Sequence, residues 1–137
     1  MPATPNTILA LDVGKVRIGL AIARTDTRFP VPHTTLTNDE AFIAELQTLV
    51  SQESVAQLVV GLPRGLDGQD TEQTHYVRQF AAGLEQAVNL PVAFQDEALT
   101  SHKAEQELQG RKKRYTKEDV DALSATYILE DYLGGAA

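Results

Sequence analysis

The fold of this chain is decided by residues 7–14, Thr7-Ile8-Leu9-Ala10-Leu11-Asp12-Val13-Gly14. The mostly apolar run predicts a buried strand, which leads into Asp12 and breaks at Val13-Gly14. A carboxylate at the rim of a hydrophobic core is costly unless a partner compensates its charge. A bound cation is one such partner, so Asp12 is the first candidate for a functional residue.

A second strand follows the turn at residues 13–15. Residues 16–23 alternate between large apolar side chains and a set that is small except for one arginine, which predicts the second arm of a hairpin. The second set comprises Arg17, Gly19, Ala21 and Ala23. A third strand near residues 31–36 is restricted by Pro30 and Pro32 to a sheet edge or a short segment, because proline cannot donate a ladder hydrogen bond.

Helices and strands alternate in the middle of the chain. Apolar periodicity predicts a helix that opens with Asn38 or Asp39 as its cap. A buried strand at residues 57–60 is expected to end at Gly61, before a loop rich in glycine and proline. A second helix then places an apolar stripe along residues 77–88.

The next strand, at residues 91–95, ends in two carboxylates, Asp96 and Glu97. It is followed by a short polar helix for which Thr100 or Ser101 can serve as the cap. This strand therefore resembles the first one, because both run from an apolar stretch into acidic residues.

A last helix is predicted from about residue 117 to residue 133. Thr116 and Asp119 have the spacing of a capping box at its start. An initial hairpin followed by alternating strands and helices predicts an α/β fold with a mixed five-stranded sheet, mostly parallel in its second half, and helices on both faces.

Composition favours one soluble domain over residues 1–137. A chain of 137 residues can bury one sizeable core and is short for two. The absence of cysteine excludes disulfides and thiolate metal sites. The sequence shows neither a secretory signal nor an apolar run of membrane-spanning length, so we expect a cytoplasmic protein without a membrane partner.

The charge distribution is uneven. The net charge is −7, which argues against a polyanionic partner, but five of the twelve basic residues fall in one short segment. This basic arm comprises Arg111, Lys112, Lys113, Arg114 and Lys117. A solvated loop or helix end explains such a run equally well, and nucleic-acid backbone contact is the functional alternative.

Three carboxylates are expected to meet. In open α/β sheets the functional crevice lies beyond the carboxyl ends of the parallel strands, where Asp12 and Glu97 are predicted. On the last helix, Asp121 shares a small and apolar face with Ser124 and Ala125. Asp119 lies on a more polar side, and the helix dipole explains its position at the N-terminus. We therefore expect Asp121, rather than Asp119, to join the cluster.

Clustered carboxylates without histidine or cysteine suit Mg²⁺ or Mn²⁺ rather than zinc. Two such ions would activate a water and stabilise the leaving oxygen of a phosphodiester. Asp12 would bridge both ions, Glu97 would complete one site and Asp121 would hold the other. Ordinary strand-end and helix-start acids are the alternative explanation for each residue taken alone.

Four blocks in chain order resemble the YqgF/RuvX family of small bacterial ribonuclease H-like proteins, over nearly the whole sequence. The blocks are Leu11-Asp12-Val13-Gly14-Lys15-Val16-Arg17-Ile18-Gly19-Leu20-Ala21; Val59-Val60-Gly61-Leu62-Pro63 followed by Asp67-Gly68; Asp96-Glu97-Ala98-Leu99-Thr100-Ser101; and Asp121-Ala122-Leu123-Ser124-Ala125 leading to Ile128-Leu129.

The resemblance implies a ribonuclease H-like sheet with the first strand central, and a metal-dependent nuclease site at Asp12, Glu97 and Asp121. It also implies a hydrolase that matures the 5′ end of precursor 16S ribosomal RNA or, alternatively, cleaves four-way (Holliday) DNA junctions. Junction cleavage needs two symmetric cuts and hence a homodimer, whereas a monomer can trim one RNA end. Arg17, Arg64 and the basic arm are the candidate contacts to nucleic acid.

One departure from the family pattern leaves a different class of function open. Ala98 stands where the family usually has arginine, so a protein that binds structured RNA without cutting it is a further alternative. The strand-Asp-x-Gly hairpin also resembles the phosphate-binding turn of actin-like ATP-binding proteins. Those proteins close two domains around the nucleotide, and this chain has room for one.

Overall fold

The structure of the protein is a computed structural model, which describes residues 5–65, 67–97, 106–107 and 116–135. Its strands are β1 (Thr7–Val13), β2 (Arg17–Arg24), β3 (Val31–Thr37), β4 (Val55–Pro63) and β5 (Val92–Glu97). Its helices are α1 (Phe42–Gln52), α2 (Glu72–Val88) and α4 (Lys117–Gly135).

The five strands form one mixed sheet in the order β3-β2-β1-β4-β5. Strand β1 pairs antiparallel with β2 and parallel with β4, and β4 pairs parallel with β5. The expected central position of the first strand and the edge position of β3 are confirmed. Because β1, β4 and β5 run in the same direction, their carboxyl ends share one edge of the sheet.

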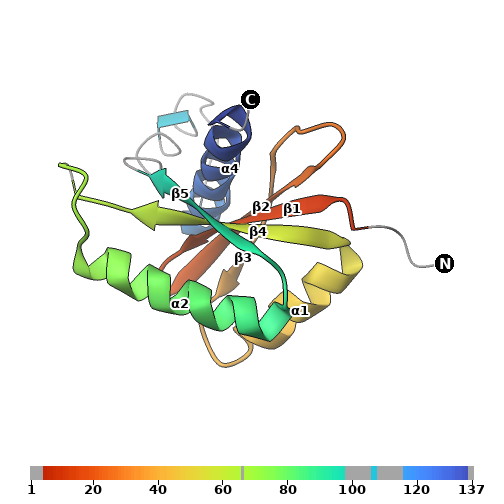
Figure 1. The fold of residues 1–137 in the computed structure, drawn as a ribbon, viewed down its shortest axis with the longest axis horizontal. Coiled ribbons are helices and arrows are strands. Elements are labelled where there is room, and N and C mark those ends of the chain that lie inside the picture. Colours follow the sequence, from red (N-terminus) through yellow and green to blue (C-terminus); the bar gives the residue numbers. More distant parts are fainter. Residues whose placement is uncertain (1–4, 66, 98–105, 108–115, 136–137) are drawn as a thin grey trace.

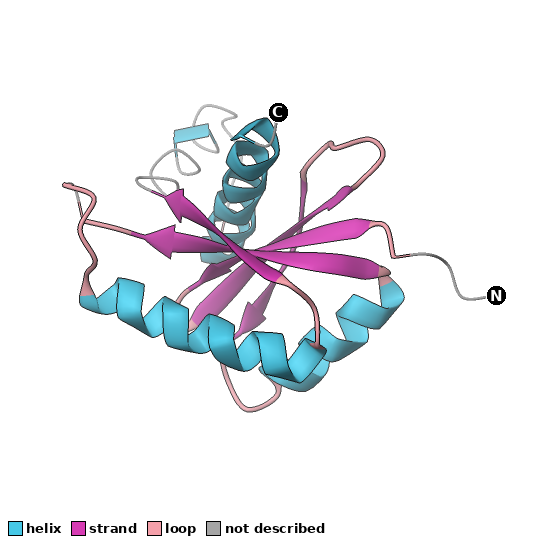
Figure 2. Ribbon diagram, viewed as in Figure 1, coloured by secondary structure: helices cyan, strands magenta, loops and turns pink. Residues whose placement is uncertain are grey.

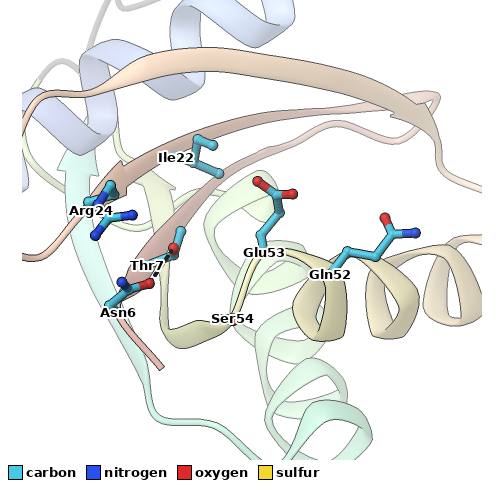
Figure 3. Close-up of a pocket in the computed structure, with 7 residues that line it drawn as sticks. All are labelled: Asn6, Thr7, Ile22, Arg24, Gln52, Glu53 and Ser54. Carbon is cyan, nitrogen blue, oxygen red and sulfur yellow. Dashed lines mark hydrogen bonds between the residues drawn. The ribbon is translucent and has the colours of Figure 1, made fainter. Parts of the chain in front are cut away.

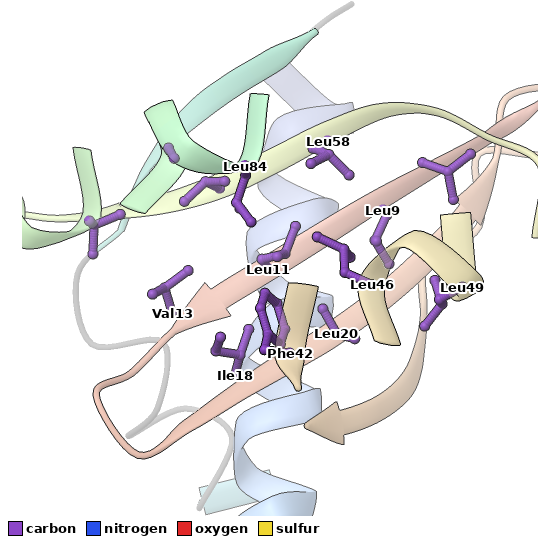
Figure 4. Close-up of a cluster of buried hydrophobic side chains, with 14 of the residues drawn as sticks. Leu9, Leu11, Val13, Ile18, Leu20, Phe42, Leu46, Leu49, Leu58 and Leu84 are labelled. Carbon is purple, nitrogen blue, oxygen red and sulfur yellow. The ribbon is translucent and has the colours of Figure 1, made fainter. Parts of the chain in front are cut away.

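Helices cover both faces of the sheet, as expected. Figures 1 and 2 show α1 and α2 on one face and α4 crossing the other. On the first face Leu9 and Leu11 of β1 pack with Phe42 and Leu46 of α1 in a closed apolar core (Figure 4). Alternation along β1 turns Ile8 to the second face, where it packs against α4.

The face toward α4 is lined by small side chains. Ala10 of β1 and Ala21 and Ala23 of β2 are buried there against Ala125 and Ile128 of the helix. Short side chains on both partners allow a helix to approach a sheet closely. Helix α4 is consequently buried on most of its circumference, unlike an amphipathic surface helix.

Two predicted boundaries are wrong. Helix α1 begins at Phe42 after Ala41, which makes no side-chain cap, and not at Asn38 or Asp39. Asp39 instead accepts a hydrogen bond from the Ala41 amide at 2.9 Å, in a turn that precedes the helix. Strand β4 does not end at Gly61 but continues to Pro63, because its ladder with β5 extends to the end of that strand.

The predicted capping box at the start of α4 is confirmed. The amide of Asp119 donates to Thr116 Oγ1 at 3.1 Å, and the amide of Thr116 donates to Asp119 Oδ2 at 2.9 Å. The short polar helix predicted after Ser101 falls largely outside the described residues. In the described parts of the chain, no helix is both long enough and apolar enough to cross a membrane.

Replacement of Thr116 by alanine should lower the free energy of unfolding by about 1 kcal/mol. The change removes the hydroxyl that accepts from the Asp119 amide, and only the bond from the Thr116 amide to Asp119 can remain. Thr116→Ser keeps the hydroxyl and should remain close to wild type. Urea denaturation followed by circular dichroism measures both, and equal losses in the two variants would contradict a capping role.

Candidate active site

Asp12 lies near the carboxyl end of β1, on the side of the sheet that α4 covers. The strand continues through Asp12 and ends at Val13, at the predicted break, and Asp12 pairs with Gly19 of β2. Alternation places Asp12 on the same face as Ile8 and Ala10, which contact α4. Its carboxylate is therefore partly buried at the rim of an apolar layer.

Gly19 is the reason that α4 can reach this rim. A Cβ atom at residue 19 would collide with the backbone carbonyl of Asp121 and with the amide of Ala122. The helix backbone thus rests directly on the strand, at the residue that pairs with Asp12. Close contact at Gly19 brings Asp121 into the neighbourhood of Asp12.

Gly61 of β4 makes room for the third carboxylate in a similar way. A Cβ atom there would lie 3.0 Å from the carboxyl carbon and Oε2 of Glu97, and it would also collide with Ile128 Cδ1. Glu97 ends β5, one strand further from β1, and pairs with Pro63. The bare backbone at Gly61 lets its side chain extend over β4 on the side of α4.

The three predicted carboxylates are electrostatically coupled. Burial raises the pKa of Asp12 well above its ordinary value, and the negative charges of Glu97 and then Asp121 raise it further. Repulsion of this kind requires short distances in a medium that screens poorly. The structure therefore brings together Asp12, Glu97 and Asp121, which lie far apart in the sequence.

Arg17 holds the carboxylate of Asp121. Its Nε atom donates to Asp121 Oδ2 at 2.6 Å, and the two side chains are 29% and 20% exposed. This hydrogen bond, followed by the charge of Asp121, raises the pKa of Arg17. The sequence predicted Arg17 as a phosphate contact or an exposed strand residue, and it gave no indication of this partner.

The donor chemistry of the three carboxylates fits a hard divalent cation, because each supplies anionic oxygen. Within the described residues, however, no three acidic, histidine or cysteine side chains are already arranged as a metal site. Arg17 engages Oδ2 of Asp121, so a cation shared with Asp12 would have to compete with the guanidinium for this carboxylate.

The turn between β1 and β2 is fixed by Asn38. Its Nδ2 atom donates to the carbonyl of Gly14 at 2.8 Å and to the hydroxyl of Tyr76 at 3.0 Å. Its backbone amide donates to the carbonyl of Val16 at 2.9 Å. The turn that separates Asp12 from Arg17 is thus attached to α2 and to the end of β3.

Arg64 is held within the protein. Its Nη1 atom donates to Asp70 Oδ1 at 2.7 Å, while Nε lies 3.3 Å from Asp96 Oδ1 and is buried without a hydrogen bond. Arg78 approaches Asp70 from the other side at 3.6 Å. These contacts tie the loop after β4 to the end of β5, next to Glu97.

The remaining predicted contacts to nucleic acid lie in the basic arm. Lys117 is exposed at the first residue of α4. Residues 111–114 and Ala98 lie outside the described residues.

A surface pocket lies at the other end of the sheet, beside the amino end of β1, and is lined by Thr7, Arg24 and Glu53 among others (Figure 3). It is remote from the three carboxylates.

The sequence matches proteins of one family over nearly its whole length. The RuvX family model, described as Holliday junction resolvase, matches residues 6–135. A protein of Maridesulfovibrio salexigens is 41% identical over 133 residues, which cover 94% of this chain and 98% of that protein. One from Chloroflexus aurantiacus is 43% identical over 130 residues, covering 92% and 85%. Both carry the name "Putative pre-16S rRNA nuclease".

Solved structures with low sequence identity share the fold. RuvC of T. thermophilus, solved with a Holliday junction substrate, has a TM-score of 0.61 at 12% identity and matches 96% of this chain and 97% of its own. The fowlpox virus resolvase, also bound to junction DNA, has a TM-score of 0.58 at 10% identity, with 95% and 98% covered. The expected ribonuclease H-like fold is confirmed.

Gly19→Ala should lower the free energy of unfolding by about 2–4 kcal/mol, because the added methyl group meets helix backbone that cannot rotate away. Gly83→Ala is the matched control. A Cβ at this residue of α2 meets nothing within 4 Å, so the change should stabilise the protein by about 0.5–1 kcal/mol. Chemical denaturation of both variants tests the close contact, and a neutral Gly19→Ala would contradict it.

Asp12→Asn should stabilise the metal-free protein at neutral pH. Because the folded-state pKa of Asp12 lies above that of the unfolded chain, ionisation costs more in the folded protein, and the free energy of unfolding falls as pH rises through the folded pKa. The advantage of the variant should therefore shrink as pH falls below that pKa. Thermal unfolding in a chelator at several pH values measures it, with exposed Asp131→Asn as the control.

Proposed function

Because this chain belongs to the RuvX family, we propose that it is a metal-dependent nuclease that hydrolyses phosphodiester bonds in structured nucleic acid. A hydrolase of this class must hold a phosphodiester, activate a water and stabilise the oxygen that leaves. The chain offers three carboxylates at the edge of the sheet where α/β proteins place their sites.

The observation that supports the proposal most directly is the placement of Asp121 and Glu97 around Asp12, with which the raised pKa of Asp12 agrees. Three acids that repel one another at the rim of a core destabilise a protein when no cation is present. Two glycines, Gly19 and Gly61, admit this arrangement by removing the side chains that would block it. A cation-binding function explains both the acids and the glycines.

Asp12, Glu97 and Asp121 would ligate Mg²⁺ or Mn²⁺. Asp12 would be a ligand both of the ion held with Glu97 and of the ion held with Asp121. When bound, the cations supply an activated water and neutralise charge on the leaving oxygen. The protein's own part is to hold the carboxylates on three rigid elements, β1, β5 and α4. The apolar layer beneath Asp12 keeps the surroundings poorly screening, which strengthens each electrostatic contact.

The substrate that we propose is the 5′ end of precursor 16S ribosomal RNA, in keeping with the names of the curated relatives. The description of the family model favours a second candidate, the four-way DNA junction. Lys117, at the start of α4, and residues 111–114 would bind backbone phosphates. Arg64 is proposed as a further contact, although Asp70 now holds its guanidinium. Such contacts add affinity that falls with salt.

A side-by-side cleavage assay tests the proposal. Purified protein is incubated with Mn²⁺ and, separately, with precursor 16S RNA and a four-way DNA junction. Fragments from the RNA alone support ribosomal RNA processing, and symmetric cuts in the junction support the second candidate. Retarded migration of either substrate without fragments would contradict catalysis and favour a binding protein.

Asp12→Asn, Glu97→Gln and Asp121→Asn should each reduce cleavage by about 100-fold or more, because each removes anionic oxygen from the proposed cation site. Asp131→Asn, an exposed change on the same helix as Asp121, should cleave like wild type. Circular dichroism verifies that the variants are folded. Full activity in Asp12→Asn would overturn the assignment.

A further inference from the structure

Asp121 is already occupied by a cation that belongs to the protein. Arg17 Nε lies 2.6 Å from Asp121 Oδ2, which is short for a hydrogen bond between charged groups. Both side chains are mostly shielded, at 29% and 20% exposure, so solvent screens the pair less than a surface ion pair. One oxygen of the proposed metal ligand, Oδ2, is therefore already engaged.

The pair is placed by rigid backbone on both sides. Arg17 opens β2, and its carbonyl accepts a hydrogen bond from the amide of Gly14 at 2.9 Å. Two residues later on the same face, Gly19 lies directly beneath the backbone of Asp121. Arg17 and Asp121 are consequently held side by side, although 104 residues separate them in the chain.

Arg17 offsets one of three negative charges. Without its guanidinium, the negative charge of Asp121 beside Asp12 and Glu97 would have less compensation, since the charges of Glu97 and Asp121 both raise the pKa of Asp12. A guanidinium and a divalent cation on the same carboxylate repel each other in turn. The presence of Arg17 thus stabilises the metal-free site and opposes its filling.

We propose that Arg17 is an internal counter-cation that holds Asp121 while no metal is bound and releases it when the carboxylates take up a divalent cation. Arg17 then sets the metal concentration at which the site fills. This inference rests on the proposed function, in which Asp121 is a metal ligand. Once released, the guanidinium lies at the rim of the site, where a substrate phosphate can accept its hydrogen bonds.

Calorimetric titration of metal-free protein with Mn²⁺ tests the role of Arg17 without a cleavage assay. Arg17→Gln should bind Mn²⁺ about two- to fivefold more tightly than wild type, the range expected when one partly exposed ion pair stops competing. Arg17→Lys keeps the charge and should remain closer to wild type. Arg24→Gln is the matched control, because Arg24, at the other end of β2, forms an ion pair with Asp26 in the following turn, away from the carboxylates.

Thermal unfolding gives a second readout. Metal-free Arg17→Gln should unfold at a lower temperature than wild type, and Mn²⁺ should raise its unfolding temperature by more. In an Asp121→Asn background, Arg17→Gln should no longer tighten Mn²⁺ binding, because the proposed competition acts through that carboxylate.

The outcomes separate the two hypotheses. Unchanged or weaker Mn²⁺ binding by Arg17→Gln, with wild type binding normally, would overturn the counter-cation role and leave the proposed nuclease intact, since the carboxylates of the wild-type protein would still bind the metal. Failure of both wild type and Arg17→Gln to bind Mn²⁺ would overturn the proposed metal-dependent function together with this inference. Binding by the variant alone would support the counter-cation role.

Discussion

Helix α4 can lie on the sheet because β2 presents almost no side chain to it at Gly19, Ala21 and Ala23. This close contact between α4 and β2 determines two other features of the protein. It seals the second face of β1, which would otherwise expose Ile8 and Ala10. It also determines how far the helix backbone stands from Asp12, and hence whether a residue of α4 can join a site built on the strands.

The carboxylate cluster destabilises the folded protein, and the proposed cation site explains why it is present. Burial and two neighbouring negative charges raise the pKa of Asp12 and oppose its ionisation, a cost that an apolar or neutral residue would not carry. Natural sites often combine such a local cost with surroundings that sustain it. Here the surroundings are two packed layers on a central strand, together with the guanidinium of Arg17.

Much of this architecture could be predicted from the sequence, because period-two alternation and apolar stripes indicate which side chains are buried. The central strand, the edge strand and the capping box of α4 follow from local patterns. The start of α1 and the end of β4 do not, because Asp39 caps a turn that precedes the helix and pairing with β5 carries β4 past Gly61. The ion pair of Arg17 with Asp121 could not be predicted from the sequence, because the two side chains come together only when α4 packs on β2. The small set at alternate positions of β2 was the available signal, and it indicated a close neighbour without saying which.

The position of Asp121 on α4 has a consequence for timing. Chains emerge from the ribosome in order, and the segments that carry Asp12 and Glu97 emerge before α4 does. A sheet that forms on the nascent chain would hold only two of the three acids, with Gly19 uncovered. The complete cluster therefore arises only once α4 has been synthesised and has docked on β2, so a shorter nascent chain does not yet carry an assembled site.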